Sequence, residues 1–193
     1  MNAAVTRSLF ICLVFSAGAD RWTLQASDEA DNDAALVAES DGLIASPEPG
    51  WPQWRGPRRD GVSSETGLLP VWPEGGPKLL WKVDGLGQGW SSPIVVDGRL
   101  YVTGDVGEDL VVWAYDLHGK PLWRSKIGAA WLGSFPGARA CCVYSQGRLY
   151  HLNAHGRLAC LDAGSGNEQW AVDVLERFQA SNITWALSEC LLI

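Results

Sequence analysis

The 193-residue chain lacks a long apolar run, a basic excess and a helical hydrophobic period. The apolar stretch LFICLVF near its start (residues 9–15) is far shorter than the roughly 20 residues of a membrane-spanning helix. The net charge is −7, and no stripe of Lys and Arg indicates a nucleic-acid surface. No segment repeats its apolar residues every 3.6 positions, so the sequence does not predict a helical protein.

The common short motifs of catalysis are also missing. The sequence has no Gly-rich phosphate loop, no nucleophile elbow and no Cys-x-x-Cys pair. His151 and His155 are four residues apart, but they flank a strand-to-turn step and are expected to point differently, so we predict no metal site there. Acidic residues fall at predicted turns or loops, namely Asp97, Asp105, Glu108, Asp109, Asp116 and Asp162.

The first fifty residues differ in composition from the rest. They hold 2 basic and 8 acidic side chains, against 13 and 14 in residues 51–193. Arg7, the apolar stretch and the small residues 17–19 predict a signal peptide over residues 1–19, the alternative being a disordered apolar N-terminus. Residues 20–49 predict an acidic disordered linker. We therefore expect an exported protein, periplasmic or extracellular, without a transmembrane span.

Tryptophan is the aromatic residue in excess, with 11 Trp against 4 Phe and 4 Tyr, which suggests a repeat. Matched positions are Gly98–Tyr101 with Gly147–Tyr150, Asp116 with Asp162, and Trp123 with Trp170, at offsets of 49, 46 and 47 residues. A period near 47 residues, with short Val-, Leu- and Tyr-rich stretches between glycines, is typical of β-propeller blades. The predicted fold is an all-β propeller of four-stranded antiparallel blades, of which about two to three are present.

Residues 50–193 are predicted to be this partial propeller. The strands expected in the blade over residues 91–128 are Ser92–Val96, Arg99–Thr103, Leu110–Asp116 and Pro121–Ile127. Those expected in the blade over residues 139–174 are Ala140–Tyr144, Arg148–Asn153, Arg157–Asp162 and Glu168–Val174.

Two further fragments extend the pattern. Leu79–Val83 matches the last strand of each blade and is predicted to be the strand that closes the ring. Leu187–Ile193 is predicted to start a third blade, with Cys190 at the position of Cys142 and Pro93. The sequence is thus predicted to stop within a blade, and open blade edges predict aggregation or self-association.

The motif CLDAGSGNEQW (residues 160–170) resembles the tryptophan-docking motif Ala-x-Asp-x-x-Thr-Gly-x-x-x-Trp. AYDLHGKPLW (residues 114–123) resembles it with a shorter turn. The chain is identified as a member of the pyrroloquinoline-quinone-like β-propeller repeat family. It resembles secreted bacterial members of planctomycete type and the propeller of the outer-membrane barrel-assembly machinery. The resemblance covers residues 51–193 and is specific for fold rather than activity.

The resemblance implies structural roles for the motif residues. Docking tryptophans lie between adjacent blades, glycines allow the turns, and aspartates bond turn amides. The residues expected in these roles are Trp81, Asp116, Gly119, Trp123, Asp162, Gly166 and Trp170.

The segment WPQWRGPRRDG (residues 51–61) opens a strap that we expect to span residues 51–78 and to lead into the closing strand. We expect Trp51 and Trp54 to cover a blade edge and Arg55 to bond carbonyls. The alternative is a loop that contacts a ligand.

The first functional hypothesis is an exported, non-catalytic propeller that binds a protein or polymer at its surface, with no cofactor. The alternatives are a fragment of a quinoprotein alcohol dehydrogenase, with pyrroloquinoline quinone and calcium, or a truncated, unproductive gene product. Under the dehydrogenase alternative, the resemblance allows Cys141 and Cys142 to form a disulfide against the quinone. The alternative without a functional role is that Cys142 and Cys190 are simply small buried residues. The disulfide state of Cys141, Cys142, Cys160 and Cys190 stays open.

Overall fold

The computed structural model describes residues 50–67 and 70–193. The predicted signal peptide and acidic linker lie outside the described residues. Within the described residues, no helix is both long and apolar enough to cross a membrane.

The first sheet has four antiparallel strands in the order β1-β2-β3-β4. They are β1 (Ile94–Val96), β2 (Arg99–Val106), β3 (Asp109–Asp116) and β4 (Pro121–Ala129). Asp97 and Gly98 turn the chain between β1 and β2 with φ of 51° and 70°. Two consecutive positive φ angles are typical of the tight hairpin turn that an Asp-Gly pair predicts.

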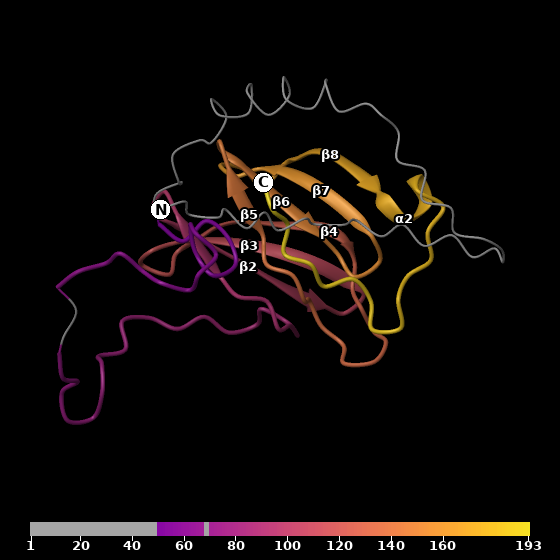
Figure 1. Ribbon diagram of the computed structural model, residues 1–193. Helices are drawn as coiled ribbons and strands as arrows, with labels where there is room; N and C mark the ends of the chain where they lie inside the picture. Colours follow the sequence, from indigo (N-terminus) through magenta and orange to yellow (C-terminus); the bar gives the residue numbers. More distant parts are fainter. Residues whose placement is uncertain (1–49, 68–69) are drawn as a thin grey trace, which may run out of the picture. The chain divides into compact units, whose positions relative to one another are not determined.

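The second sheet repeats the arrangement in the order β5-β6-β7-β8. Its strands are β5 (Val143–Ser145), β6 (Arg148–Leu152), β7 (Arg157–Asp162) and β8 (Glu168–Asp173). In Figure 1 the two sheets lie side by side, with β4 next to the β5–β8 sheet. Two successive four-stranded antiparallel sheets confirm the predicted fold class of propeller blades.

One hydrophobic core joins the two sheets. Val96, Tyr101 and Val112 of the first sheet belong to the same buried cluster as Leu149 and Leu161 of the second. The outer strands contribute little to it, since β8 is almost entirely exposed and β4 buries only Ile127. The core therefore sits on the inner strands, and each sheet depends on its neighbour for part of its burial.

The two strands predicted outside the two blades are not formed. The structure assigns no strand to Leu79–Val83 or to Leu187–Ile193. A strand persists through hydrogen bonds to a neighbour, and neither segment is paired with a strand of the two described sheets. The predicted strand Glu168–Val174 also ends one residue early, because the short helix α2 (Val174–Arg177) begins where Asp173 caps the amide of Glu176.

Candidate functional site

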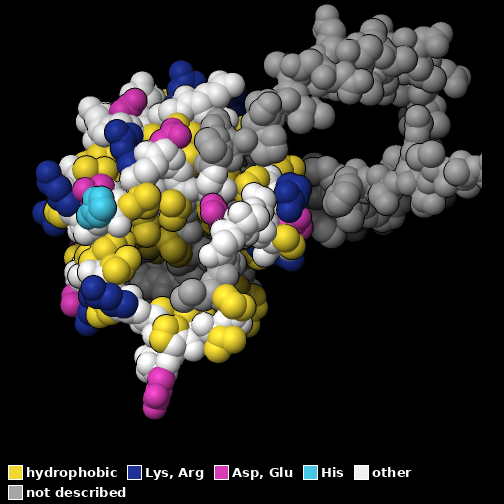
Figure 2. Space-filling view, turned by 90° about the vertical axis from the view of Figure 1, so that its left-hand side faces the viewer, with side chains coloured by type: hydrophobic (Ala, Val, Ile, Leu, Met, Phe, Trp, Pro, Cys, Tyr) yellow, Lys and Arg dark blue, Asp and Glu magenta, His cyan; other side chains and the backbone are white. Residues whose placement is uncertain are grey.

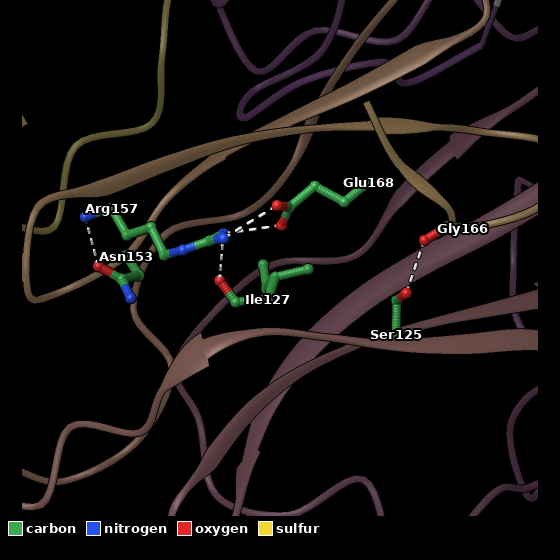
Figure 3. Close-up of polar contacts among 6 residues, drawn as sticks. All are labelled: Ser125, Ile127, Asn153, Arg157, Gly166 and Glu168. Atoms are coloured by element: carbon green, nitrogen blue, oxygen red, sulfur yellow. Dashed lines mark hydrogen bonds and ion pairs between the residues drawn. The ribbon is translucent and has the colours of Figure 1, made fainter. Parts of the chain in front are cut away.

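Trp123 lies where the two sheets meet. Its indole Nε1 donates a hydrogen bond to the carbonyl of Ala163 over 3.1 Å. Its ring lies so close to Gly166 that a Cβ built on this glycine would be 2.4 Å from the ring. Ser125, also on β4, donates to the Gly166 carbonyl over 2.6 Å (Figure 3). Strand β4 of the first sheet is thereby attached to the β7–β8 turn of the second.

Trp81 makes the same pair of contacts one blade earlier in the chain. Its Nε1 donates to the Leu117 carbonyl over 2.9 Å, and its ring covers Gly119. Leu117 follows Asp116 as Ala163 follows Asp162, so the two indoles bind equivalent turns. Although no strand forms here, the segment around Trp81 lies where the last strand of a preceding blade would lie.

Trp170 occupies the third equivalent position but has a different environment. It is 44% exposed and contacts Tyr150 with ring centroids 6.1 Å apart. Within the described residues, no following turn covers its outer face. The three tryptophans therefore form one series, in which two lie against a neighbouring turn and the third is open.

Asp116 and Asp162 hold these turns together. Asp116 accepts from the amides of His118 and Lys120 over 2.8 and 2.9 Å. Asp162 accepts from both the amide and the hydroxyl of Ser165 over 2.8 and 2.7 Å. These hydrogen bonds, led by the Lys120 amide for Asp116 and the Ser165 hydroxyl for Asp162, lower the pKa of both carboxyls.

A second group of polar contacts joins the sheets beside the docking turn. Arg157 on β7 forms a bidentate ion pair with Glu168 on β8, at 2.8 and 2.9 Å, and donates to the Ile127 carbonyl on β4 over 3.0 Å (Figure 3). The ion pair raises the pKa of Arg157 and lowers that of Glu168. No sequence motif singled out Arg157, because its partner carbonyl on β4 is known only from the packing of the two sheets.

The strap contacts both sheets at their inner edges. Trp51 pairs with Val95 of β1 through two backbone hydrogen bonds of 2.6 and 3.0 Å, and the Pro52 carbonyl accepts from the Tyr144 amide of β5 over 2.8 Å. The strap therefore lies along an edge strand of each sheet. Such edges are otherwise open to pairing with other chains.

Arg59 connects the strap to carbonyl groups far away in the sequence. Arg59 donates to the carbonyls of Leu191 and Cys190 over 2.7 and 3.0 Å. Arg55 donates only locally, to the carbonyl of Asp60 over 3.1 Å, and stacks near Trp54. Arg55, which was expected to bond carbonyls, thus has a carbonyl partner within the strap, whereas the distant carbonyl partners belong to Arg59 and cannot be read from the local sequence.

A hollow of about 390 Å³ opens between the strap and the C-terminal segment, by which we mean residues 187–193. Its lining is aromatic, cationic and sulfur-containing, and includes Trp54, Arg59, Trp90, Arg139, Cys141 and Cys190. Trp54 and Trp90 are 43% and 67% exposed. On the face shown in Figure 2, hydrophobic side chains gather in the middle and Lys and Arg lie around the edge. Exposed apolar groups of this kind are typical of interaction surfaces.

The hollow also revises the predicted register of the third blade. Cys190 lies beside Cys141, with the sulfurs 3.5 Å apart, and both line the hollow together with Ser92. Cys190 is thus equivalent to Cys141, 49 residues earlier, rather than to Cys142. The one-residue slip was invisible in the sequence because adjacent cysteines match equally well.

Three polar side chains meet at a small cavity of about 10 Å³ between the sheets. His151 is buried with its Nε2 on the Ala140 carbonyl at 3.1 Å, and Asp105 accepts from the Trp131 amide over 2.9 Å. All three residues line this space, and Asp105 Oδ1, Arg139 Nε and His151 Nδ1 are buried without a hydrogen-bond partner among the described residues. Burial lowers the pKa of His151 to about 4 and raises that of Asp105. His151 is therefore neutral at pH 7.

The described residues do not fit a quinone held by calcium. Calcium takes six to eight oxygen ligands, whereas the hollow is lined by a single carboxylate, that of Glu189, together with the guanidinium groups of Arg59 and Arg139. No group of three acidic, His or Cys side chains suited to a metal exists within the described part of the chain.

The sheets, docking indoles and turns define a tryptophan-docked β-propeller built from quinoprotein-like repeats. Residues 17–184 match the family described as outer membrane protein assembly factor BamB, and the chain belongs to this family.

Several solved structures are similar to part of this chain. They include quinohemoprotein alcohol dehydrogenase from Comamonas testosteroni (24% identity, 47% of this chain, 14% of that chain, TM-score 0.36). A europium-containing methanol dehydrogenase is 20% identical, with 50% of this chain and 18% of that chain covered and a TM-score of 0.39. Quinohemoprotein alcohol dehydrogenase ADHIIG from Pseudomonas putida HK5 is 27% identical, with 48% of this chain and 14% of that chain covered and a TM-score of 0.37. The chain thus spans less than a fifth of each of these proteins. No curated protein matches it.

Proposed function

We propose that this chain belongs to an exported, non-catalytic propeller that binds another protein chain at the hollow between strap and C-terminal segment. The observation that carries the proposal is the hollow itself, in which Trp54 and Trp90 remain exposed beside Arg59 and Arg139. Trp and Arg dominate the energetics of protein interfaces. The family description, outer membrane protein assembly factor, supports a protein as the ligand.

The chemistry of the hollow favours an extended segment with alternating aromatic and polar residues. Strands of outer-membrane barrels alternate apolar and polar residues and carry aromatic residues near both ends of their apolar band. The flat indoles would contact the aromatic side chains, and the two guanidinium groups would contact carboxylates or carbonyls. The hollow has too few negatively charged side chains to favour a cationic partner, since Glu189 is the only carboxylate among its lining residues.

The test is fluorescence anisotropy of the full chain with a labelled ten-residue peptide of alternating aromatic and polar residues. We expect saturable binding, and replacement of Trp54 or Trp90 with alanine should weaken it about thirtyfold, the effect of an interface hot spot worth about 2 kcal/mol. Trp72→Ala is the matched control, because Trp72 is 64% exposed in the strap but does not line the hollow.

Thermal melts of each variant separate lost binding from lost folding, which matters for Trp90 because its indole donates to the Pro136 carbonyl. Equal loss of binding in Trp72→Ala, or no binding at all, contradicts the proposal. Alcohol-dependent dye reduction after loading with pyrroloquinoline quinone and calcium would favour the dehydrogenase alternative instead.

A further inference from the structure

We propose that Cys141 and Cys190 are a dithiol that oxidises to a disulfide, which fastens the C-terminal segment to the start of the second sheet. The sulfurs are already 3.5 Å apart, with the Cys141 thiol donating to Cys190. A disulfide requires closely approaching Cβ atoms and a sulfur separation near 2 Å, so only a small movement is needed. The inference does not depend on the proposed binding function.

The two residues meet because they are equivalent positions in successive repeats. Their separation of 49 residues equals the offset between Gly98–Tyr101 and Gly147–Tyr150. In the first blade the same register holds Ser92, which lines the same hollow. Equivalent positions at the start of successive blades therefore lie around one space, and two of the three carry a thiol.

The two thiols differ in access and charge. Cys190 is half-buried and lines the hollow, whereas Cys141 is only 2% exposed. The hydrogen bond from Cys141, with the nearby Arg59 guanidinium, lowers the pKa of Cys190, and the same bond with burial raises that of Cys141. Cys190 is thus suited to attack first, because the thiolate is the nucleophile.

A small-molecule disulfide such as oxidised glutathione can supply the oxidation. The Cys190 thiolate attacks one of its sulfurs, forming a mixed disulfide and releasing one glutathione thiolate. Cys141 then loses its proton and attacks Cys190 Sγ, which releases the second glutathione. The protein loses two protons and two electrons, which reduce glutathione disulfide to two thiols.

Among the described cysteines, Cys141 and Cys190 make the sulfur–sulfur contact, whereas Cys142 and Cys160 are more deeply buried than Cys190. Cys142 and Cys160 are 2% and 0% exposed, and burial raises the pKa of both thiols. The Cys141–Cys190 bond would add a covalent link to a segment already held by Arg59. It would also fix one wall of the hollow.

The test treats the full chain with oxidised glutathione, blocks free thiols by alkylation, and maps linkages by mass spectrometry without reduction. We expect a linked peptide pair two hydrogens lighter than the separate thiols. Because trypsin leaves Cys141 and Cys142 together between Arg139 and Arg148, the experiment is repeated in Cys142→Ser. The link should persist there and vanish in Cys190→Ser.

A melting measurement supplies a second readout. Reductant should lower the melting temperature of the oxidised protein by roughly 10 °C, since the bond closes a long loop. It should leave Cys190→Ser unchanged. A Cys141–Cys142 bond, a lasting glutathione adduct on Cys190, or two freely alkylated thiols after oxidation would each overturn the proposal.

Discussion

Replacing Trp123 with alanine is expected to lower the free energy of unfolding by about 3 kcal/mol, within the usual range for removing a large core side chain. The indole is half-buried between the sheets, packs against Tyr101 with ring centroids 5.8 Å apart, and bonds the Ala163 carbonyl. The change removes apolar burial and one hydrogen bond together. Urea unfolding of the full chain, followed by circular dichroism, measures the effect.

Trp170→Ala is the matched control, because it removes the same side chain from the equivalent position of the next blade. Trp170 is 44% exposed and lacks the turn contact, so its loss should cost less than about 1 kcal/mol. Similar losses for the two variants would mean that blade docking does not determine the energetics of these tryptophans.

Gly166 tests the same contact from the other side. It has a φ of +74°, and any Cβ there would overlap the Trp123 ring. Gly166→Ala should therefore destabilise the wild-type chain more than it destabilises Trp123→Ala, where the overlap is gone. This non-additivity is the mark of direct contact. Purely additive effects would show that the strain is confined to the backbone of the turn.

Acidification from pH 7 to pH 4 is expected to remove about 3 kcal/mol of stability through His151 alone. Its pKa in the folded chain is about 4, below the ordinary value of 6.5, because the ring is buried. Between these values the unfolded chain binds more protons, so stability rises with pH. The contribution is present above pH 6.5 and is lost as the pH falls toward 4.

The measurement compares urea unfolding at pH 7, 5.5 and 4 for the wild type and His151→Gln. Glutamine can keep a donor toward the Ala140 carbonyl but does not titrate in this range. Asp105 borders the same cavity and acts in the opposite direction, since its pKa is raised, so the difference between the two proteins isolates His151. Equal pH dependence of both would show that His151 does not bring about the acid sensitivity.

Most strands could be predicted because their signals are local. Asp97–Gly98 and Gln146–Gly147 adopt the positive φ angles of tight hairpin turns, and apolar stretches flank them. The two predicted strands that did not form, Leu79–Val83 and Leu187–Ile193, have the same local composition. Composition shows that a segment can pair, but a ladder also requires a neighbour, and the neighbour is set by the fold.

The sequence by itself determined the blade repeat, the aspartate turns and the series of three tryptophans, because each depends on residues close together in the chain. Tertiary structure alone decided that Arg59 holds the C-terminal segment, that Cys190 meets Cys141, and that His151 shares a cavity with Asp105. These pairs are separated by 46 to 131 residues. Their meeting follows from how one sheet packs on the next, which no local pattern records.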